Sequence, residues 1–178
     1  MRVSAPFVVA FVPGVTPGKW ERIWRERMPR SPLEVRPLPQ ADALAALETG
    51  EVHMALVRDV VADDTRHVIP LYRERTVVVA EKEHAVAAFD ELTLAELAGE
   101  TLLEGEGADT IELVAANVGL ALMPMSVARA HSRRDLVARV VTDAPETGIG
   151  LAWPREAEDA RIESFIGIVR GRTVNSSR

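Results

Sequence analysis

The stretch that decides the fold is V-A-A-N-V-G-L-A-L-M-P, residues Val114 to Pro124. Gly119 is the residue type that most often adopts the left-handed turn after a helix, so the stretch predicts that a helix ends there. Leu120 to Met123 are apolar at every position, as expected for a strand covered on both faces. Pro124 ends that strand and can begin the next helix, where its missing N–H costs nothing. This order of helix, glycine, buried strand and proline predicts an α/β fold.

The N-terminal part of the chain shows the same alternation of strands and helices. Trp20, Trp24 and Met28 recur at helical spacing and give the first helix one apolar face. The expected elements are strands at 7–12, 33–36 and 52–57, and helices at 17–28 and 41–49. Strands that alternate with helices through short connections predict parallel pairing.

Two capping patterns mark predicted helix starts further along the chain. Thr93 with Glu96, and Asp109 with Glu112, have the spacing of a capping box. The second pattern would open the helix that Gly119 closes. The other expected elements are strands at 68–72, 76–80, 101–103, 120–123, 136–141 and 148–153, and a final amphipathic helix that contains Ile162, Phe165, Ile166 and Val169.

Composition limits the function classes. The chain has 178 residues, of which 47% are hydrophobic and 27% charged, which is typical of one soluble domain or two small lobes. The net charge of -6 does not indicate the basic patch of a nucleic-acid-binding protein. The absence of cysteine excludes thiol catalysis and favours a cytoplasmic location. No segment approaches the ~20 apolar residues of a membrane span, so no membrane partner is expected.

Several motifs of the chain resemble those of the effector-binding domain of LysR-type transcriptional regulators. Residues 114–124 are similar to the "VAAGxGxAxxP" signature late in that domain. Residues 40–57 are similar to its "LxxLxxGxLDxAL" element, and His53 stands where that element usually has an acidic residue. Residues 76–97 resemble the crossing strand, the "HPLA" turn and the "LxDL" helix, and 136–153 resemble the return strand.

The resemblance implies a two-lobed α/β fold of the periplasmic-binding-protein-like kind, with mainly parallel sheets. The expected boundaries are lobe I at about 5–76 plus 154–178, lobe II at about 80–150, and crossing strands at about 76–80 and 148–153. The passage from Leu103 to Thr110 takes only six residues, where the family has extra strand and helix. Either the second lobe is reduced or the sequence omits an internal stretch. The family's usual helix-turn-helix is also missing, so a stand-alone effector-binding form is expected.

The resemblance places an effector site in the cleft between the lobes. The predicted ligand-binding residues lie where expected strands end and helices begin: Gly14, Thr16, Gly18, Arg58, Glu104, Pro124 and Ser126. A helix N-terminus and a hydroxyl at Thr16 suit a carboxylate, and Arg58 suits an anion. The alternatives are that Thr16 and Ser126 only cap helices, and that Arg58 is a solvated loop charge.

The function predicted from these residues is therefore the sensing of a small anionic effector, without enzymatic activity and without a cofactor. The alternatives are a small cytosolic α/β enzyme and a transport-type solute-binding protein. No catalytic arrangement is recognisable, and the four histidines lack the spacing of a metal site. The resemblance implies a homodimer that forms through the first helix and a neighbouring strand, and at least one of Trp20 and Trp24 is expected to offer more apolar surface than a small lobe can bury. The chain alone is expected not to bind DNA.

Overall fold

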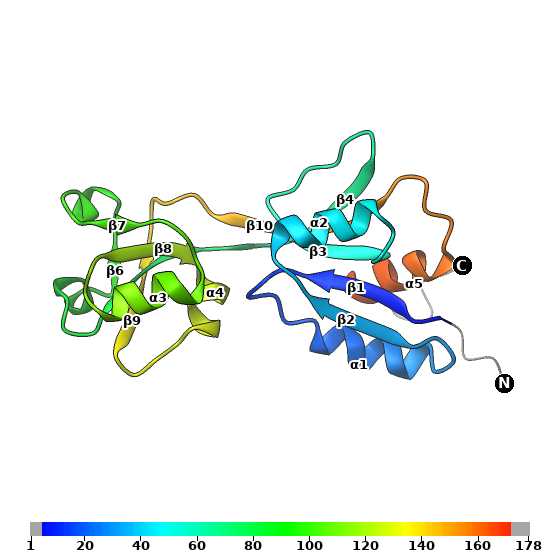
Figure 1. Ribbon diagram of the computed structural model, residues 1–178, viewed down its shortest axis with the longest axis horizontal. Coiled ribbons are helices and arrows are strands. Elements are labelled where there is room, and N and C mark those ends of the chain that lie inside the picture. Colours follow the sequence, from blue (N-terminus) through cyan, green and yellow to red (C-terminus); the bar gives the residue numbers. More distant parts are fainter. Residues whose placement is uncertain (1–4, 172–178) are drawn as a thin grey trace. The chain divides into compact units, whose positions relative to one another are not determined.

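The structure is a computed structural model that describes residues 5–171 (Figure 1). These residues form two compact units, one made of 5–72 with 148–171 and the other of 73–147. The first unit contains β1 (Phe7–Phe11), α1 (Gly18–Arg27), β2 (Leu33–Pro37), α2 (Gln40–Glu48), β3 (Met54–Arg58), most of β4 (Arg66–Glu74), most of β10 (Thr147–Pro154) and α5 (Ala160–Val169). The second contains β5 (Thr76–Glu81), the 3₁₀ helices η1 (Ala85–Ala88) and η2 (Ala95–Leu97), β6 (Glu91–Leu92), β7 (Leu102–Leu103), α3 (Ala108–Ala115), β8 (Leu120–Pro124), α4 (Met125–Ala130) and β9 (Leu136–Val141).

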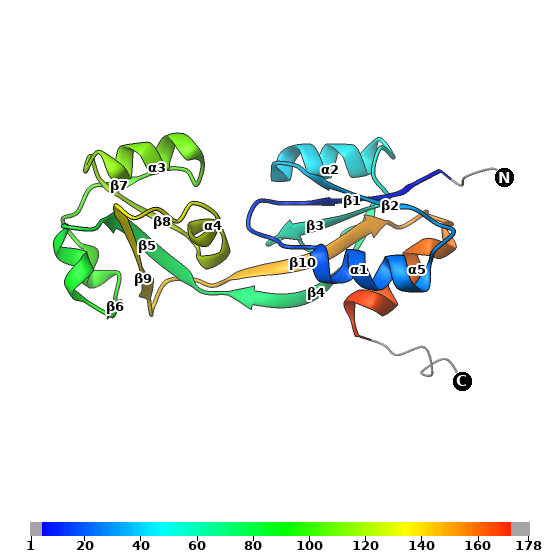
Figure 2. The same ribbon diagram turned by 90° about the horizontal axis from the view of Figure 1, so that it is seen from below.

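The sheet of the first unit has the strand order β2-β1-β3-β10-β4. β1 pairs in parallel with β2 and with β3, as the alternation of strands and helices predicts. β10 pairs antiparallel to β3 because it returns from the other unit. Figure 2 shows α2 on one side of this sheet and α1 with α5 on the other.

The core of the first unit is built on stacked aromatic rings. Phe7 of β1 stacks on Trp24 of α1, with ring centroids 5.1 Å apart and planes 7° apart, and Phe165 of α5 lies against both rings. Trp24 is only 1% exposed, and its Nε1 donates to the Ser31 carbonyl at 2.7 Å. Trp20 is half-buried against the same core. Of the two tryptophans, Trp24 is therefore a core residue, and only Trp20 keeps exposed surface for a dimer contact.

The sheet of the second unit has the order β6-β9-β5-β8-β7 and is also mixed. β5 is antiparallel to both β8 and β9, whereas the short edge strands pair in parallel. Val77 and Val79 of β5 pack on the side covered by α3 and α4. Val78 and Ala80 pack on the side covered by η1 and η2. The expected parallel pairs are present in both sheets, and antiparallel pairs are added where β10 meets β3 and where β5 meets β8 and β9.

Asn117, not Gly119, ends the helix in the deciding stretch. Asn117 has φ 55° and follows α3, and its N–H donates to the Val114 carbonyl at 2.9 Å. The Val118 N–H donates to the Leu113 carbonyl at 3.0 Å, which completes a Schellman motif. Asparagine tolerates the left-handed conformation because its short polar side chain bonds locally.

Gly119 is required for a different reason, which is the close approach of a neighbouring strand. A Cβ at Gly119 would lie 2.6 Å from the Thr101 carbonyl oxygen, just before β7. That oxygen accepts the Leu120 N–H at 2.8 Å, so it is fixed by the sheet. Pro124 is the last residue of β8 and lies just before α4. The sequence predicts it one position later, as the first residue of that helix.

One of the two predicted capping boxes is present. The Glu96 carboxylate accepts the Thr93 N–H at 2.7 Å, and the Thr93 hydroxyl accepts the Glu96 N–H at 3.4 Å. The prediction of a second capping box at Asp109 and Glu112 is wrong, because α3 begins after Gly107 and has no side-chain cap. Instead the Thr110 hydroxyl donates to the Glu104 carbonyl at 3.1 Å and closes the exposed connection between β7 and α3.

The helices within residues 5–171 include none with the length and apolar content needed to cross a membrane.

Candidate ligand-binding site

The loop after β1 is a tight turn that leads directly into α1. Pro13 and Gly14 occupy its two central positions, and the Val15 N–H donates to the Val12 carbonyl at 3.2 Å. Gly14 has φ 89°, which a type II turn requires at its third residue. The turn therefore fixes the backbone that carries Thr16 and Gly18.

Arg58 is the last residue of β3 and contacts this same turn. Its Nη2 donates to the Pro13 carbonyl at 3.1 Å. The Gln40 side chain holds the Arg58 backbone at both ends, because Oε1 accepts the Arg58 N–H and Nε2 donates to the Arg58 carbonyl, each at 2.8 Å. Gln40 thus fixes the Arg58 backbone, and the guanidinium itself contacts the turn through the Pro13 carbonyl.

Thr16 does not cap α1. The residue before the helix is Pro17, and no side chain makes a cap hydrogen bond there. Thr16 and Gly18 are both exposed, and no atom lies within 4 Å of a Cβ built on Gly18. The first N–H groups of a helix have no partner inside the helix, so this uncapped end favours an anionic group.

The predicted residues of the second unit lie on two different connections. Glu104 is exposed after β7, and Pro124 is buried at the end of β8. Ser126 is the second residue of α4 and therefore not its cap, so that alternative is also wrong. The Ser126 Oγ is buried and has no hydrogen-bond partner among the described residues. Of the seven predicted residues, Arg58 contacts the turn that contains Gly14, and Thr16 and Gly18 follow that turn along the chain.

Sequence reasoning places Asp59 at this edge, after the third strand, but missed the role of Gln40. Asp59 follows β3 with φ 52°, its Oδ1 accepts the Gly148 N–H at 2.6 Å, and its own N–H donates to the Gly148 carbonyl at 2.8 Å. The tolerance of aspartate for the left-handed region was the available signal. Nothing in the sequence indicates that Gln40 reaches a backbone 18 residues away.

Two hollows of the first unit are lined by residues other than the predicted ones. A groove of about 420 Å³ in the first unit is lined by Leu47, Thr49, Arg66 and Pro154, among others. A smaller hollow of about 90 Å³ lies beside Trp24 and Met28. Residues 5–171 also contain no group of three histidine, aspartate or glutamate side chains that could hold a metal ion. The site is thus defined by the turn, the helix end and the arginine rather than by a cavity.

Two α/β units with mixed sheets, and strands that run from one unit into the other, define a periplasmic-binding-protein-like ligand-binding domain. The chain belongs to the LysR substrate binding domain family, whose model matches residues 18–110 and 105–173. This is a family of ligand-sensing regulatory domains and not a known enzyme family. The two matched segments meet at 105–110, where the shortened passage between β7 and α3 lies.

Solved structures with the same fold include regulators that respond to different small molecules. The chain is similar to a full-length mutant of BenM, with a TM-score of 0.79, 19% identity, and coverage of 96% of this chain and 68% of that chain. It is similar to the BenM effector-binding domain with its effector benzoate, with a TM-score of 0.79, 19% identity, and coverage of 96% and 92%. A mutant OxyR regulatory domain from Pseudomonas aeruginosa gives a TM-score of 0.76, 19% identity, and coverage of 96% and 99%. No curated protein matches the sequence.

Proposed function

We propose that this domain senses a small anionic molecule whose acidic group binds at the turn after β1. The observation that carries this proposal is the Arg58 guanidinium, which donates to the Pro13 carbonyl in the turn that leads into the uncapped N-terminus of α1, while Gln40 fixes the Arg58 backbone. Together these groups supply a fixed positive charge, backbone N–H groups and the exposed Thr16 hydroxyl. The benzoate carboxylate bound by the similar BenM domain supports the same chemical class of effector. The role of Glu104, Pro124 and Ser126 in the same binding event stays a prediction.

Replacing Thr16 with valine is expected to weaken the binding of a carboxylate effector by roughly 1.5–3 kcal/mol, or about ten- to a hundredfold. The hydroxyl is lost while the β-branched shape is kept. Since Thr16 does not cap α1, the free energy of unfolding should change by less than about 0.5 kcal/mol. Calorimetric titration with benzoate and a panel of small carboxylates measures the affinity, and urea unfolding measures the stability.

Two further variants sharpen this test. Thr49→Val removes a hydroxyl at the C-terminal end of α2, where Oγ1 donates to the Ala46 carbonyl, and should leave the affinity unchanged. Gly18→Ala should not lower the stability, because the added methyl meets no atom, but it should weaken an anion that lies against the helix end. If Thr16→Val and Gly18→Ala both bind the verified carboxylate like the unaltered protein, the proposed position is wrong.

We also propose that the domain forms a homodimer in which α1 of one copy contacts α3 of the other. α1 exposes Arg25 and α3 exposes Asp109, whereas the neighbouring Arg22 and Glu112 already pair with Glu26 and Arg133. Leu113 at the end of α3 is 46% exposed, which adds an apolar contact beside the charges. The opposite charges favour contact between the two different helices over contact between identical ones.

Arg25→Glu is expected to weaken dimerisation by about tenfold, because it places like charges in the contact. Asp109→Arg should do the same, and the double variant should recover much of the affinity. Sedimentation equilibrium at low salt measures each association constant. A wild-type protein that stays monomeric at high micromolar concentration would contradict the proposal.

We further propose that the chain alone does not bind DNA and that it acts in the cytoplasm. The net charge of -6 supports the first part, since DNA-binding surfaces neutralise phosphates with clustered basic residues. Membership of a family of transcriptional regulator domains supports the second.

A further inference from the structure

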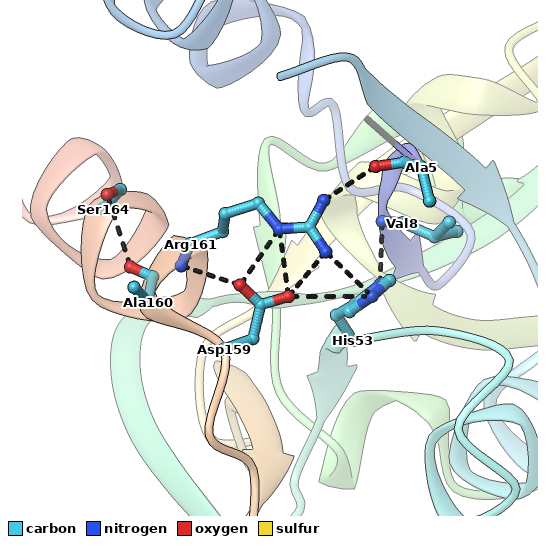
Figure 3. Close-up of polar contacts among 7 residues, drawn as sticks. All are labelled: Ala5, Val8, His53, Asp159, Ala160, Arg161 and Ser164. Atoms are coloured by element: carbon cyan, nitrogen blue, oxygen red, sulfur yellow. Dashed lines mark hydrogen bonds and ion pairs between the residues drawn. The ribbon is translucent and has the colours of Figure 1, made fainter. Parts of the chain in front are cut away.

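His53 extends the pairing between β1 and β3 with its side chain. It lies just before β3, and its backbone N–H donates to the Val8 carbonyl at 2.9 Å. Its imidazole Nδ1 accepts the Val8 N–H at 3.0 Å, as Figure 3 shows. Val8 is buried in the sheet, so this ring nitrogen satisfies a backbone N–H that is shielded from water.

The geometry fixes the tautomer of the imidazole. A backbone N–H can only donate, so Nδ1 must be unprotonated and the ring proton must lie on Nε2. Nε2 lies 3.8 Å from Asp159 Oδ2 and 3.5 Å from Arg161 Nη2, both at the start of α5 (Figure 3). These are the charged groups within reach of the ring among the described residues. From β1 the ring meets the uncharged side chain of Phe7, with centroids 4.9 Å apart.

Asp159 and Arg161 are held firmly on the α5 side. Arg161 donates to the Asp159 carboxylate through Nε at 3.0 Å and Nη2 at 2.6 Å, and its Nη1 donates to the Ala5 carbonyl at 2.8 Å. Hydrogen bonding from Arg161 lowers the pKa of the Asp159 carboxyl, and the nearby His53 acts in the same direction. Hydrogen bonding from Arg161 therefore favours the anionic form of Asp159 beside the ring.

We propose that His53 is a proton-operated link to β1, in which protonation of the imidazole releases the Val8 N–H. A protonated imidazole carries hydrogen on both nitrogens and can no longer accept from Val8. The same proton gives the ring a charge opposite to that of Asp159 and equal to that of Arg161, whose Nη2 lies 3.5 Å from Nε2 and already donates to Asp159. The Val8 N–H is thus the group that loses its partner as the pH falls.

The residue type at position 53 decides whether this link can respond to pH. An amide or carboxylate oxygen at this position would still accept the Val8 N–H at a pH at which an imidazole carries a proton on both nitrogens. Imidazole changes its charge between about pH 5 and pH 8. With His53 at this position, the acceptor of the Val8 N–H is therefore one that loses its accepting ability when it is protonated.

The test is a nuclear magnetic resonance measurement on the full chain at about pH 7.5 and about pH 5.5, across the imidazole range. At the higher pH, the ring ¹⁵N shifts should show Nδ1 unprotonated. At the lower pH, the exchange protection of the Val8 amide should fall about tenfold relative to that of Val9, after correction for intrinsic exchange.

Two variants separate the roles of the ring nitrogens. His53→Asn places an oxygen near the position of Nδ1 and does not titrate, so Val8 should stay protected at both values of pH. His53→Gln reaches toward Asp159 instead, so Val8 should be poorly protected at both. Equal protection of Val8 in the wild-type protein at both values of pH, or a protonated Nδ1 at the higher one, would overturn the proposal even if neither variant folds.

Discussion

Replacing Trp24 with alanine is expected to lower the free energy of unfolding by about 3–5 kcal/mol. Trp24 is the largest fully buried side chain, and its removal leaves a cavity between Phe7 and Phe165. The Ser31 carbonyl also loses the Nε1 donor. Urea unfolding followed by far-ultraviolet circular dichroism measures the loss without relying on the fluorescence of the deleted ring.

Trp20→Ala is the matched control, because Trp20 lies on the same helix but is only half-buried. Its loss should be less than half as large. Trp24→Phe should lie between the two, since it keeps an aromatic ring over Phe7 and removes only the hydrogen bond and part of the volume. Equal losses for Trp20→Ala and Trp24→Ala would show that Trp24 is not the centre of this core.

Gly119→Ala is expected to destabilise the second unit by about 2–3 kcal/mol, although it adds a single methyl group. The new Cβ would lie 2.6 Å from the Thr101 carbonyl oxygen and 3.0 Å from the Leu103 side chain. The side chain can move, but the carbonyl is held in place by its bond to the Leu120 N–H. Hydrogen exchange of the Leu120 amide, together with urea unfolding, reports whether β7 separates from β8.

Gly167→Ala provides the control for the substitution itself. Gly167 lies inside α5, and no atom lies within 4 Å of its added Cβ. Alanine there should stabilise the protein by roughly 0.5–1 kcal/mol through helix propensity. If Gly119→Ala is tolerated equally well, the close approach of Thr101 is not what requires glycine.

The fold was largely predictable because its signals are local. Buried runs such as Phe7–Phe11 and Leu120–Pro124 are apolar throughout, and the helices show regular apolar spacing. The errors arose where a residue type has more than one physical use. Gly119 was assigned to a left-handed turn, whereas the turn is made by Asn117 and the glycine admits a neighbouring carbonyl.

The candidate site was less predictable because it depends on contacts between distant segments. Strand ends and helix starts indicate where Thr16 and Arg58 lie along the chain. No local pattern reveals that Gln40 holds the Arg58 backbone, or that His53 accepts from Val8 across 45 residues. Such bonds are fixed by strand register, which the sequence specifies only through the whole sheet.

The connection between β7 and α3 has a consequence for how this chain can vary in evolution. It runs from an edge strand of two residues through the exposed Glu104 and Glu106, and the Thr110 hydroxyl closes it onto the Glu104 carbonyl. Residues can be gained or lost there without changing the inner strands β5 and β8, and loop length itself affects folding only weakly. Insertions and deletions are therefore tolerated best at this edge, which makes it the natural point of length divergence among homologous domains.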